Sequence, residues 1–200
     1  MVRVAISVEG QTEERFVQMS IVPYLQERDI YAMPFLLGRT GGNVSFARIK
    51  KDLNRLAGSF DKVTTFYDFY GFRDKDDNDS KTSLEQKIKN CVAGPLRDRI
   101  IPYIQMYEFE GLLFSSPDAI ASVLEDDELL IWAKDILRQF GGDPERINDS
   151  PQTAPSKRFA LTPYRKITHG PNIAKEIGID ALRGKCTGFD NWLAILAGLQ

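Results

Sequence analysis

The sequence predicts an α/β fold, in which a parallel sheet flanked by helices is followed by a helical C-terminal half. Short apolar runs alternate with helical hydrophobic patterns up to Glu108, and parallel strands need such crossover connections. Beyond Glu108 the strand pattern stops and only helical pieces follow. We therefore expect residues 1–110 to form the α/β core and residues 111–200 a helical extension packed on it, as one structural unit.

Strands of the core are expected where β-branched and aromatic residues lie between turn residues. These strands are Val2–Val8, Ile30–Leu37, Lys62–Tyr67 and Ile100–Tyr107. The connecting helices are Thr12–Arg28, with a kink at Pro23, one that begins after a cap at Asn43, and Thr82–Arg97, interrupted near Gly94. The helical pieces of the extension are Leu112–Phe114, Ile120–Leu124, Leu129–Phe140, Phe159–Ile167, Ile173–Ile177 and Trp192–Leu199.

Composition narrows the class of protein. With 42% hydrophobic and 27% charged residues in 200, the chain can bury a core, which excludes a mainly disordered state. No apolar run approaches the ~20 residues of a membrane span, so no membrane association is expected. The two cysteines form no Cys-x-x-Cys motif, and this favours a reducing, cytoplasmic location. The segment Gly38–Gly42 lacks the Gly-Lys-Ser/Thr of a phosphate loop, which argues against ATP hydrolysis by this chain alone.

Charge is distributed unevenly along the chain. The net charge of −2 argues against a strongly basic nucleic-acid coat. However, residues 108–149 hold eleven acids and three bases, whereas residues 151–185 hold seven bases and two acids. This asymmetry indicates one face that concentrates carboxylates and another that could meet phosphates, although ordinary internal pairing would also explain it.

Acidic residues follow the ends of three predicted strands. Glu9 follows the first strand, Asp68 the third and Glu108 the fourth. Because the carboxyl ends of parallel strands share the edge at which open α/β sheets bind ligands, we expect these acids to lie close together. Two more acids flank them. Glu13 lies in the first turn of the next helix, and Glu110 shares a side with Glu108 if the strand continues.

Such a group of carboxylates predicts a metal site. Neighbouring carboxylates disfavour each other's ionisation, and a divalent cation removes that conflict. Ligation by oxygen alone suits Mg²⁺ or Mn²⁺, and a metal at this edge could activate water and neutralise a phosphoryl oxygen, as phosphodiester cleavage requires. We expect Glu9, Asp68 and Glu108 to bind the metal, with Glu13 and Glu110 completing a second site or acting as general base.

Basic residues of the C-terminal half are candidates for contacts with phosphate. Lys157 and Arg158 could stabilise developing charge in catalysis, but solvated bases at a helix start would look the same. Together with Arg165 and Lys166, they are the expected nucleic-acid-binding residues. His169, the only histidine, could move a proton or simply close a turn. A single histidine gives little support to a zinc protease or a Ser-His-Asp hydrolase.

Several of these segments resemble a known family. Ser7–Glu13 is similar to the first motif of Toprim domains, the fold shared by topoisomerases, primases and nucleases of the overcoming-lysogenization-defect (OLD) type. Phe66–Gly71 falls where these domains carry Asp-x-Asp, and Tyr107–Phe114 looks like a block of an uncharacterised Toprim-like family of bacteria. Further similarity to that family lies in Pro155–Arg158, His169-Gly170 and Cys186–Trp192, so the resemblance covers nearly the whole chain.

The resemblance implies a Toprim-like sheet and a metal-dependent nuclease. It implies Mg²⁺ or Mn²⁺ as cofactor, nucleic acid (DNA rather than RNA) as substrate, and a function in phage defence beside an AAA-type ATPase partner. Tyr70 replaces the second Asp of Asp-x-Asp and so removes a ligand, for which Glu108 or Glu110 could substitute. Other hypotheses stay open: a non-catalytic partner or sensor subunit of an ATPase complex, another phosphoryl-transfer enzyme such as a phosphatase, and a homo-oligomer.

Overall fold

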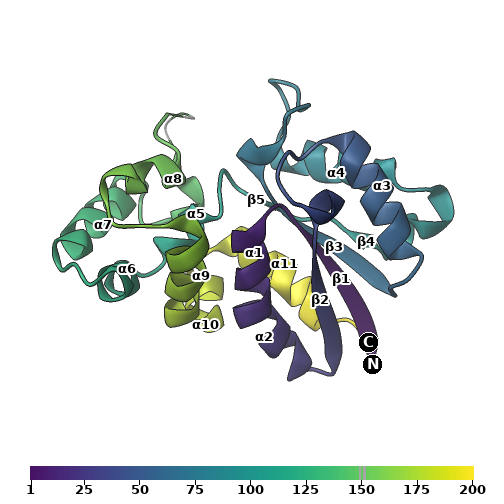
Figure 1. Ribbon diagram of the computed structural model, residues 1–200, viewed down its shortest axis with the longest axis horizontal. Helices are drawn as coiled ribbons and strands as arrows, with labels where there is room; N and C mark the ends of the chain where they lie inside the picture. The colour runs from purple at the N-terminus through teal and green to yellow at the C-terminus, as the bar shows by residue number, and fades with distance from the viewer. Residues whose placement is uncertain (149, 151) are drawn as a thin grey trace.

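The computed structural model describes residues 1–148, 150 and 152–200, and within them a parallel five-stranded sheet forms the core (Figure 1). The strands are β1 (Val2–Val8), β2 (Ile30–Leu36), β3 (Lys62–Asp68), β4 (Ile100–Ile101) and β5 (Ile104–Gln105). Their order is β2-β1-β3-β4, and β5 also pairs with β3. Every pair is parallel. The carboxyl ends of β1 and β3 therefore meet at one edge, as the sequence predicts.

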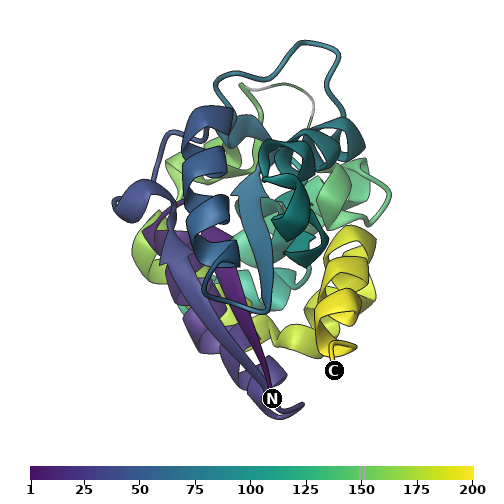
Figure 2. The same ribbon diagram turned by 90° about the vertical axis from the view of Figure 1, so that its right-hand side faces the viewer.

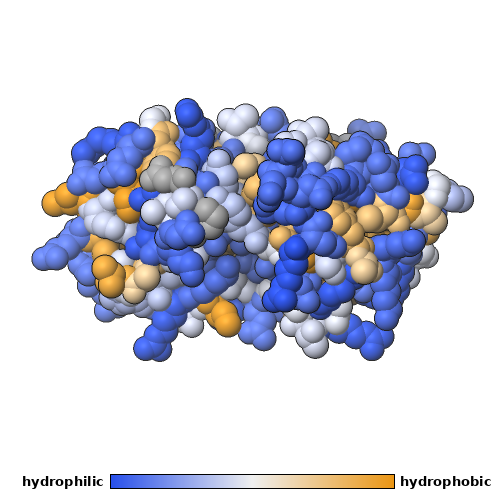
Figure 3. Space-filling view, turned by 90° about the horizontal axis from the view of Figure 1, so that it is seen from above, coloured by the Kyte–Doolittle hydropathy of each residue, from blue (hydrophilic) through white to orange (hydrophobic). Residues whose placement is uncertain are grey.

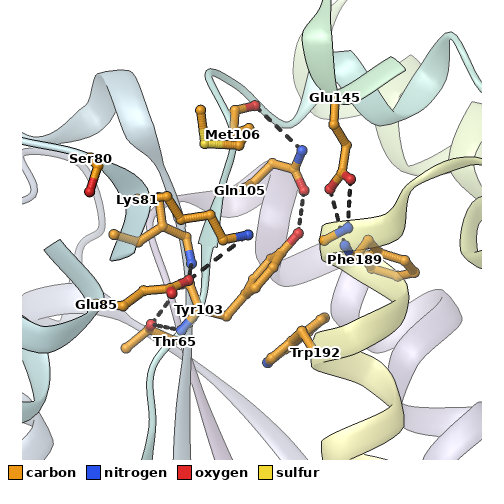
Figure 4. Close-up of polar contacts among 12 residues, drawn as sticks. Thr65, Ser80, Lys81, Glu85, Tyr103, Gln105, Met106, Glu145, Phe189 and Trp192 are labelled. Carbon is orange, nitrogen blue, oxygen red and sulfur yellow. Dashed lines mark hydrogen bonds and ion pairs between the residues drawn. The ribbon is translucent and has the colours of Figure 1, made fainter. Parts of the chain in front are cut away.

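The expected last strand, Ile100–Tyr107, is instead two short strands separated by Pro102 and Tyr103. The side chain of Thr65 takes the place of the ladder at this gap. Its hydroxyl accepts a hydrogen bond from the Tyr103 N–H at 2.9 Å and donates one to the Tyr103 carbonyl at 2.7 Å (Figure 4). Proline has no N–H to donate, so the interruption begins where the ladder cannot continue.

The helices of the core differ from expectation mainly at their ends. The first is α1 (Gln11–Phe16), a π-helical segment Val17–Ile21 and α2 (Val22–Gln26), with the π segment immediately before the predicted kink at Pro23. Helix α3 is Phe46–Ala57 and α4 is Lys81–Cys91, followed by a 3₁₀ segment, Gly94–Arg99, so the interruption expected near Gly94 is confirmed.

The predicted cap at Asn43 is wrong. The N-cap of α3 is Ser45, two residues later. Asn43 has a left-handed backbone (φ 53°), and its carbonyl accepts a hydrogen bond from the Arg48 guanidinium at 2.8 Å. The residue type tolerates this conformation, and that explains its place in the loop better than capping does.

The C-terminal half is helical. Its elements are α5 (Glu110–Leu113), α6 (Pro117–Leu124), α7 (Glu128–Gln139), a 3₁₀ turn at Pro144–Arg146, α8 (Pro155–Arg158), a 3₁₀ turn at Phe159–Leu161, α9 (Lys166–Ile177), α10 (Ile179–Lys185) and α11 (Thr187–Ala197). The expected helix Phe159–Ile167 is not continuous. Thr162 is extended, because it precedes a proline, and α9 starts only at Lys166. No helix in the described part of the chain is long and apolar enough to span a membrane.

Pro171 lies inside α9, which therefore needs a substitute for one helical hydrogen bond. A residue at this position would normally donate its N–H to the carbonyl of Ile167, four residues earlier. The guanidinium of Arg15 donates to that carbonyl instead, at 2.9 Å. This contact ties α1 to α9, and both helices carry residues of the site described below.

Hydrophobic residues alternate between two layers on either side of the sheet. Ala5 and Val63 face α3 and α4, whereas Val4 and Ile6 face α1, α2 and α11 (Figures 1 and 2). Helix α11, at the end of the chain, returns to the sheet. The indole N–H of its Trp192 donates to the Thr64 hydroxyl at 2.8 Å, and the indole stacks on Tyr103 with 4.6 Å between ring centroids (Figure 4).

Candidate functional site

Four acidic side chains from four segments of the chain come together at the carboxyl edge of the sheet. Glu9 follows β1, Asp68 ends β3, Glu13 lies in α1 and Glu110 begins α5. We call these four residues the carboxylate cluster. Glu13, Asp68 and Glu110 are only 2%, 4% and 0% exposed. Burying charged groups is costly unless they are paired, so their close approach needs a physical explanation.

The ammonium group of Lys166 is the positive charge that faces the cluster. It lies 3.4 Å from a Glu110 oxygen, 3.6 Å from Glu13 and 3.8 Å from Asp68. Lys166 is the first residue of α9, and its side chain is 44% exposed. The lysine thus reaches from the surface over three buried carboxylates and partly balances their charge.

Backbone groups and glycines fix the orientation of the carboxylates. The N–H of Asp68 donates to Glu9 at 3.2 Å, and the N–H of Phe109 donates to Asp68 at 2.8 Å. Gly71 leaves room for the Glu9 carboxylate, because a Cβ at this position would collide with it. The Tyr164 hydroxyl lies 3.4 Å from a Glu110 oxygen and donates to it. The arrangement is therefore built by β1, β3 and the loop after β5.

The four carboxyl groups would carry more negative charge than Lys166 can balance if all were ionised. Burial raises the pKa of Glu9 to about 7, and the charge of Glu13 adds to this shift. Burial also raises the pKa of Asp68 and that of Glu110. Burial alone would lower the pKa of Lys166, but the surrounding carboxylates raise it above its ordinary value. One oxygen of Glu13 is buried without a hydrogen-bond partner, and such groups are rare in folded proteins.

These residues fit a divalent cation by their chemistry but are not yet arranged around one. Their donors are all oxygens, the set that Mg²⁺ and Mn²⁺ prefer, and the Glu13 oxygen without a hydrogen-bond partner faces the Lys166 ammonium, at 3.6 Å. In the part of the chain that the structure describes, no three acidic, histidine or cysteine side chains are grouped as a ready metal site. The Lys166 ammonium lies between the carboxylates instead.

Glu108 is not brought into the cluster. Its carboxylate accepts a hydrogen bond at 2.7 Å from the N–H of Ser156, in the first turn of α8. We expected Glu108 and Glu110 to share a side if the strand continued. The strand ends at Gln105 and Glu110 begins a helix, so the spacing of two no longer places both side chains on one side.

The other predicted site residues lie apart from the carboxylates, except Lys166. Lys157 in α8 is exposed, and the Arg158 guanidinium lies 5.1 Å from the centre of the Phe140 ring. Arg165 is exposed, and its backbone N–H donates to His169 Nδ1 at 3.1 Å, so His169 helps to start α9. These contacts are made within the protein, and the binding of nucleic acid by these residues stays a prediction.

The residue that replaces the second Asp of Asp-x-Asp belongs to an aromatic group beside the cluster. Tyr70 donates its N–H to the Tyr107 carbonyl at 3.1 Å, and the two rings lie 5.6 Å apart. Sequence reasoning did not identify Gly71 or Tyr164, and it assigned Lys166 to nucleic acid rather than to the acids. The glycine three residues after Asp68 was the available signal for Gly71, since glycine often marks a close approach.

Comparisons with known proteins agree with the expected fold. Over 98% of this chain and 97% of the other, the structure is similar to the C-terminal region of the Burkholderia pseudomallei OLD protein, with a TM-score of 0.52 and 14% identity. The corresponding region of the Xanthomonas campestris pv. campestris OLD protein has a TM-score of 0.44 and 14% identity, over 98% and 94% of the chains. The first similarity confirms the predicted Toprim-like α/β fold. No curated protein matches the chain in sequence. The model of a family described as a domain of unknown function (DUF4276) matches residues 8–197, and the chain belongs to this family.

Proposed function

We propose that this protein is a divalent-metal-dependent nuclease that hydrolyses phosphodiester bonds of nucleic acid at the carboxylate cluster. The observation that carries the proposal is the gathering of three buried carboxylates and the partly buried Glu9 around the Lys166 ammonium, at the edge where α/β sheets bind ligands. A site that only stabilised the fold would gain more from apolar residues of similar size. The similarity in fold to an OLD protein supports the same class of activity.

The carboxylates of Glu9, Glu13, Asp68 and Glu110 would hold Mg²⁺ or Mn²⁺. The bound ion would supply an activated water molecule and neutralise a phosphoryl oxygen. The Glu13 oxygen that has no hydrogen-bond partner would become a ligand when Lys166 moves away from it. The Asp68 and Phe109 N–H groups orient the carboxylates of Glu9 and Asp68 before any ligand arrives, which reduces the reorganisation that binding requires.

Lys166 has a second role in this proposal. Its ammonium is now shared among three carboxylates, and a cation bound there would replace it as their counter-charge. Because the side chain is 44% exposed, it can move outward without unfolding α9. There it would stand beside the scissile phosphate and stabilise the charge that develops on its oxygens.

The experiment that tests the proposal compares two isosteric variants. Glu9→Gln should abolish Mn²⁺-dependent cleavage, measured on panels of DNA, RNA and nucleotide substrates, while the protein stays folded. Glu14→Gln is the matched control, since it removes the same charge from a neighbouring part of the chain. Undiminished cleavage by Glu9→Gln would exclude Glu9 from the mechanism. Cleavage of nucleotides alone would instead indicate a phosphatase.

One observation favours a second candidate function, a non-catalytic partner or sensor subunit. Lys166 already partly neutralises the cluster without a metal, and Tyr70 occupies the position of a usual ligand. Titration of Mn²⁺ by calorimetry separates the two functions, because a scaffold has no saturable site at these residues. The resemblance further supports an AAA-type ATPase partner, DNA as substrate and a function in phage defence as parts of the proposal. The cytoplasmic location rests on the cysteine usage, and a homo-oligomer stays an open part of the proposal. Co-purification tests the ATPase partner, and analytical ultracentrifugation tests the homo-oligomer.

A further inference from the structure

A basic cavity lies where the loop after β2 meets α3, and this loop follows the carboxyl end of its strand, as the carboxylate cluster follows β1 and β3. It measures about 420 Å³ and is lined by the loop after β2 and one face of α3, through Gly38, Arg39, Arg48, Lys51, Asp52 and Arg55. Four of these residues are cationic and one is acidic. Figure 3 looks down on the carboxyl edge of the sheet, where hydrophilic side chains predominate over the middle of the molecule.

Two of the four cations have structural partners. The Arg48 guanidinium donates to the carbonyls of Leu37, Gly42 and Asn43, and this holds the loop closed. Arg55 pairs with Asp52 at 3.9 Å, and Asp52 also accepts a hydrogen bond from the Gly38 N–H at 2.5 Å. The acid in the cavity is therefore already satisfied and adds little repulsion toward an anion.

Arg39 and Lys51 remain without a counter-charge. Both side chains are exposed, and among the residues that the structure describes neither forms an ion pair or a side-chain hydrogen bond. Arg39 has a left-handed backbone with φ 72°, next to Gly38 at φ 62°. This conformation is unfavourable for a residue other than glycine, so the fold holds Arg39 at the cavity in a strained backbone conformation.

The loop that lines the cavity is attached directly to the carboxylate cluster. The N–H of Gly42 donates to the backbone carbonyl of Glu9 at 2.7 Å. A Cβ at Gly41 would lie 2.8 Å from the same carbonyl oxygen, so only glycine allows this approach. The cavity and the cluster therefore have a fixed relation through the backbone of Glu9.

We propose that this basic cavity binds a backbone phosphate of the same nucleic acid that is cleaved at the carboxylate cluster. This inference rests on the proposed function. A guanidinium fork together with an ammonium group is the combination that binds phosphate oxygens well. Because the lining residues that the structure describes are four cations, one acid and a glycine, with no aromatic side chain to stack on a base, the cavity would contact the backbone and carry no base specificity.

The test measures binding without catalysis. A fluorescent duplex DNA is titrated in EDTA with the wild-type protein, the double variant Arg39→Gln/Lys51→Gln, and the control Lys50→Gln, an exposed lysine of the same helix outside the cavity. The double variant should bind roughly 10-fold more weakly or worse at ~0.1 M salt, and the slope of log K against log salt should fall by about 2. Lys50→Gln should match the wild type.

Equal affinity and equal salt slope for the double variant and the control would overturn the inference. A second arm measures thermal stabilisation by inorganic phosphate. If phosphate stabilises the wild type but not the double variant while DNA binding is unchanged, the cavity is a site for a free anion and the backbone assignment fails. Because all binding is measured in EDTA, a Glu9→Gln protein that still cleaves DNA refutes the catalytic use of the cluster without affecting this result.

Discussion

Raising the pH from 5 to 8 in the absence of divalent ions should destabilise this protein, and Glu9 gives the magnitude. Its pKa is raised from 4.5 to about 7 by burial and by Glu13. Between these values the folded state binds more protons than the unfolded state, so the free energy of unfolding falls as pH rises. A shift of this size corresponds to about 3 kcal/mol, or a fall in Tm of roughly 6–12 °C for a chain of this length.

Thermal unfolding in EDTA at several pH values checks this prediction. Glu9→Gln removes the titrating group but keeps an oxygen for the Asp68 N–H, so its Tm should depend less on pH than that of the wild type. The two proteins should be equally stable near pH 5, and the variant more stable at pH 8. Glu14→Gln should follow the wild type. Carboxyl groups whose pKa is lowered, such as Asp79 with a pKa of about 2, lose their contribution only at lower pH.

Addition of Mn²⁺ completes the experiment. At pH 8, where the carboxylates are most ionised, the metal should restore the Tm of the wild type, because binding to the folded state alone stabilises it. A wild-type Tm that does not change between pH 5 and 8 would refute the electrostatic reasoning. If the Tm falls with pH and Mn²⁺ does not restore it, the raised pKa values of the carboxylates are supported but the metal site is refuted.

Three other predictions follow from particular contacts. Lys166→Met should lose roughly 1–3 kcal/mol of stability in EDTA, which is less than the loss of a fully buried ion pair because the lysine side chain is partly exposed. The variant should bind Mn²⁺ more tightly in calorimetry and lose cleavage. Gly71→Ala should cost about 1–3 kcal/mol in urea unfolding and weaken Mn²⁺ binding, because its methyl group displaces a carboxylate of the cluster. Arg15→Met should cost about 1 kcal/mol, and less in a Pro171→Ala background, where the restored N–H can bond to the Ile167 carbonyl; equal costs in both backgrounds would contradict this account.

The sequence predicted the parallel sheet and three of its strands because their signals are local. Val2–Val8 is a run of β-branched and apolar residues, and its apolar side chains fill both layers. The prediction that the strands are parallel also placed Glu9 and Asp68 at one edge, since both residues lie at the carboxyl ends of such strands. Glu110 was also brought there, but by the start of a helix rather than by a strand.

What the sequence could not predict depends on contacts between distant segments. Lys166 reaches Glu13 across more than 150 positions, and no local pattern shows which of several bases faces the acids. The orientation of Glu108 depended on where β5 ends. The division of the expected last strand into β4 and β5 at Pro102 depended on the Thr65 hydroxyl, which bonds to the backbone of Tyr103. Periodicity describes single elements, whereas these outcomes are set by the packing of one element against another.

The position of Lys166 determines how a metal ion would bind to the carboxylate cluster. The three buried carboxylates and the partly buried Glu9 would not stay ionised at neutral pH without a counter-charge, so the fold needs a cation there whether or not a metal is bound. A tethered ammonium on an exposed side chain meets this need reversibly, because it can leave when a divalent ion brings more charge. The measured affinity for Mn²⁺ then reflects the difference between the free energy of binding Mn²⁺ and that of the contacts with Lys166 that the metal replaces. Lys166→Met therefore separates the hypotheses, since tighter Mn²⁺ binding in the variant is expected only if lysine and metal compete for the same oxygens.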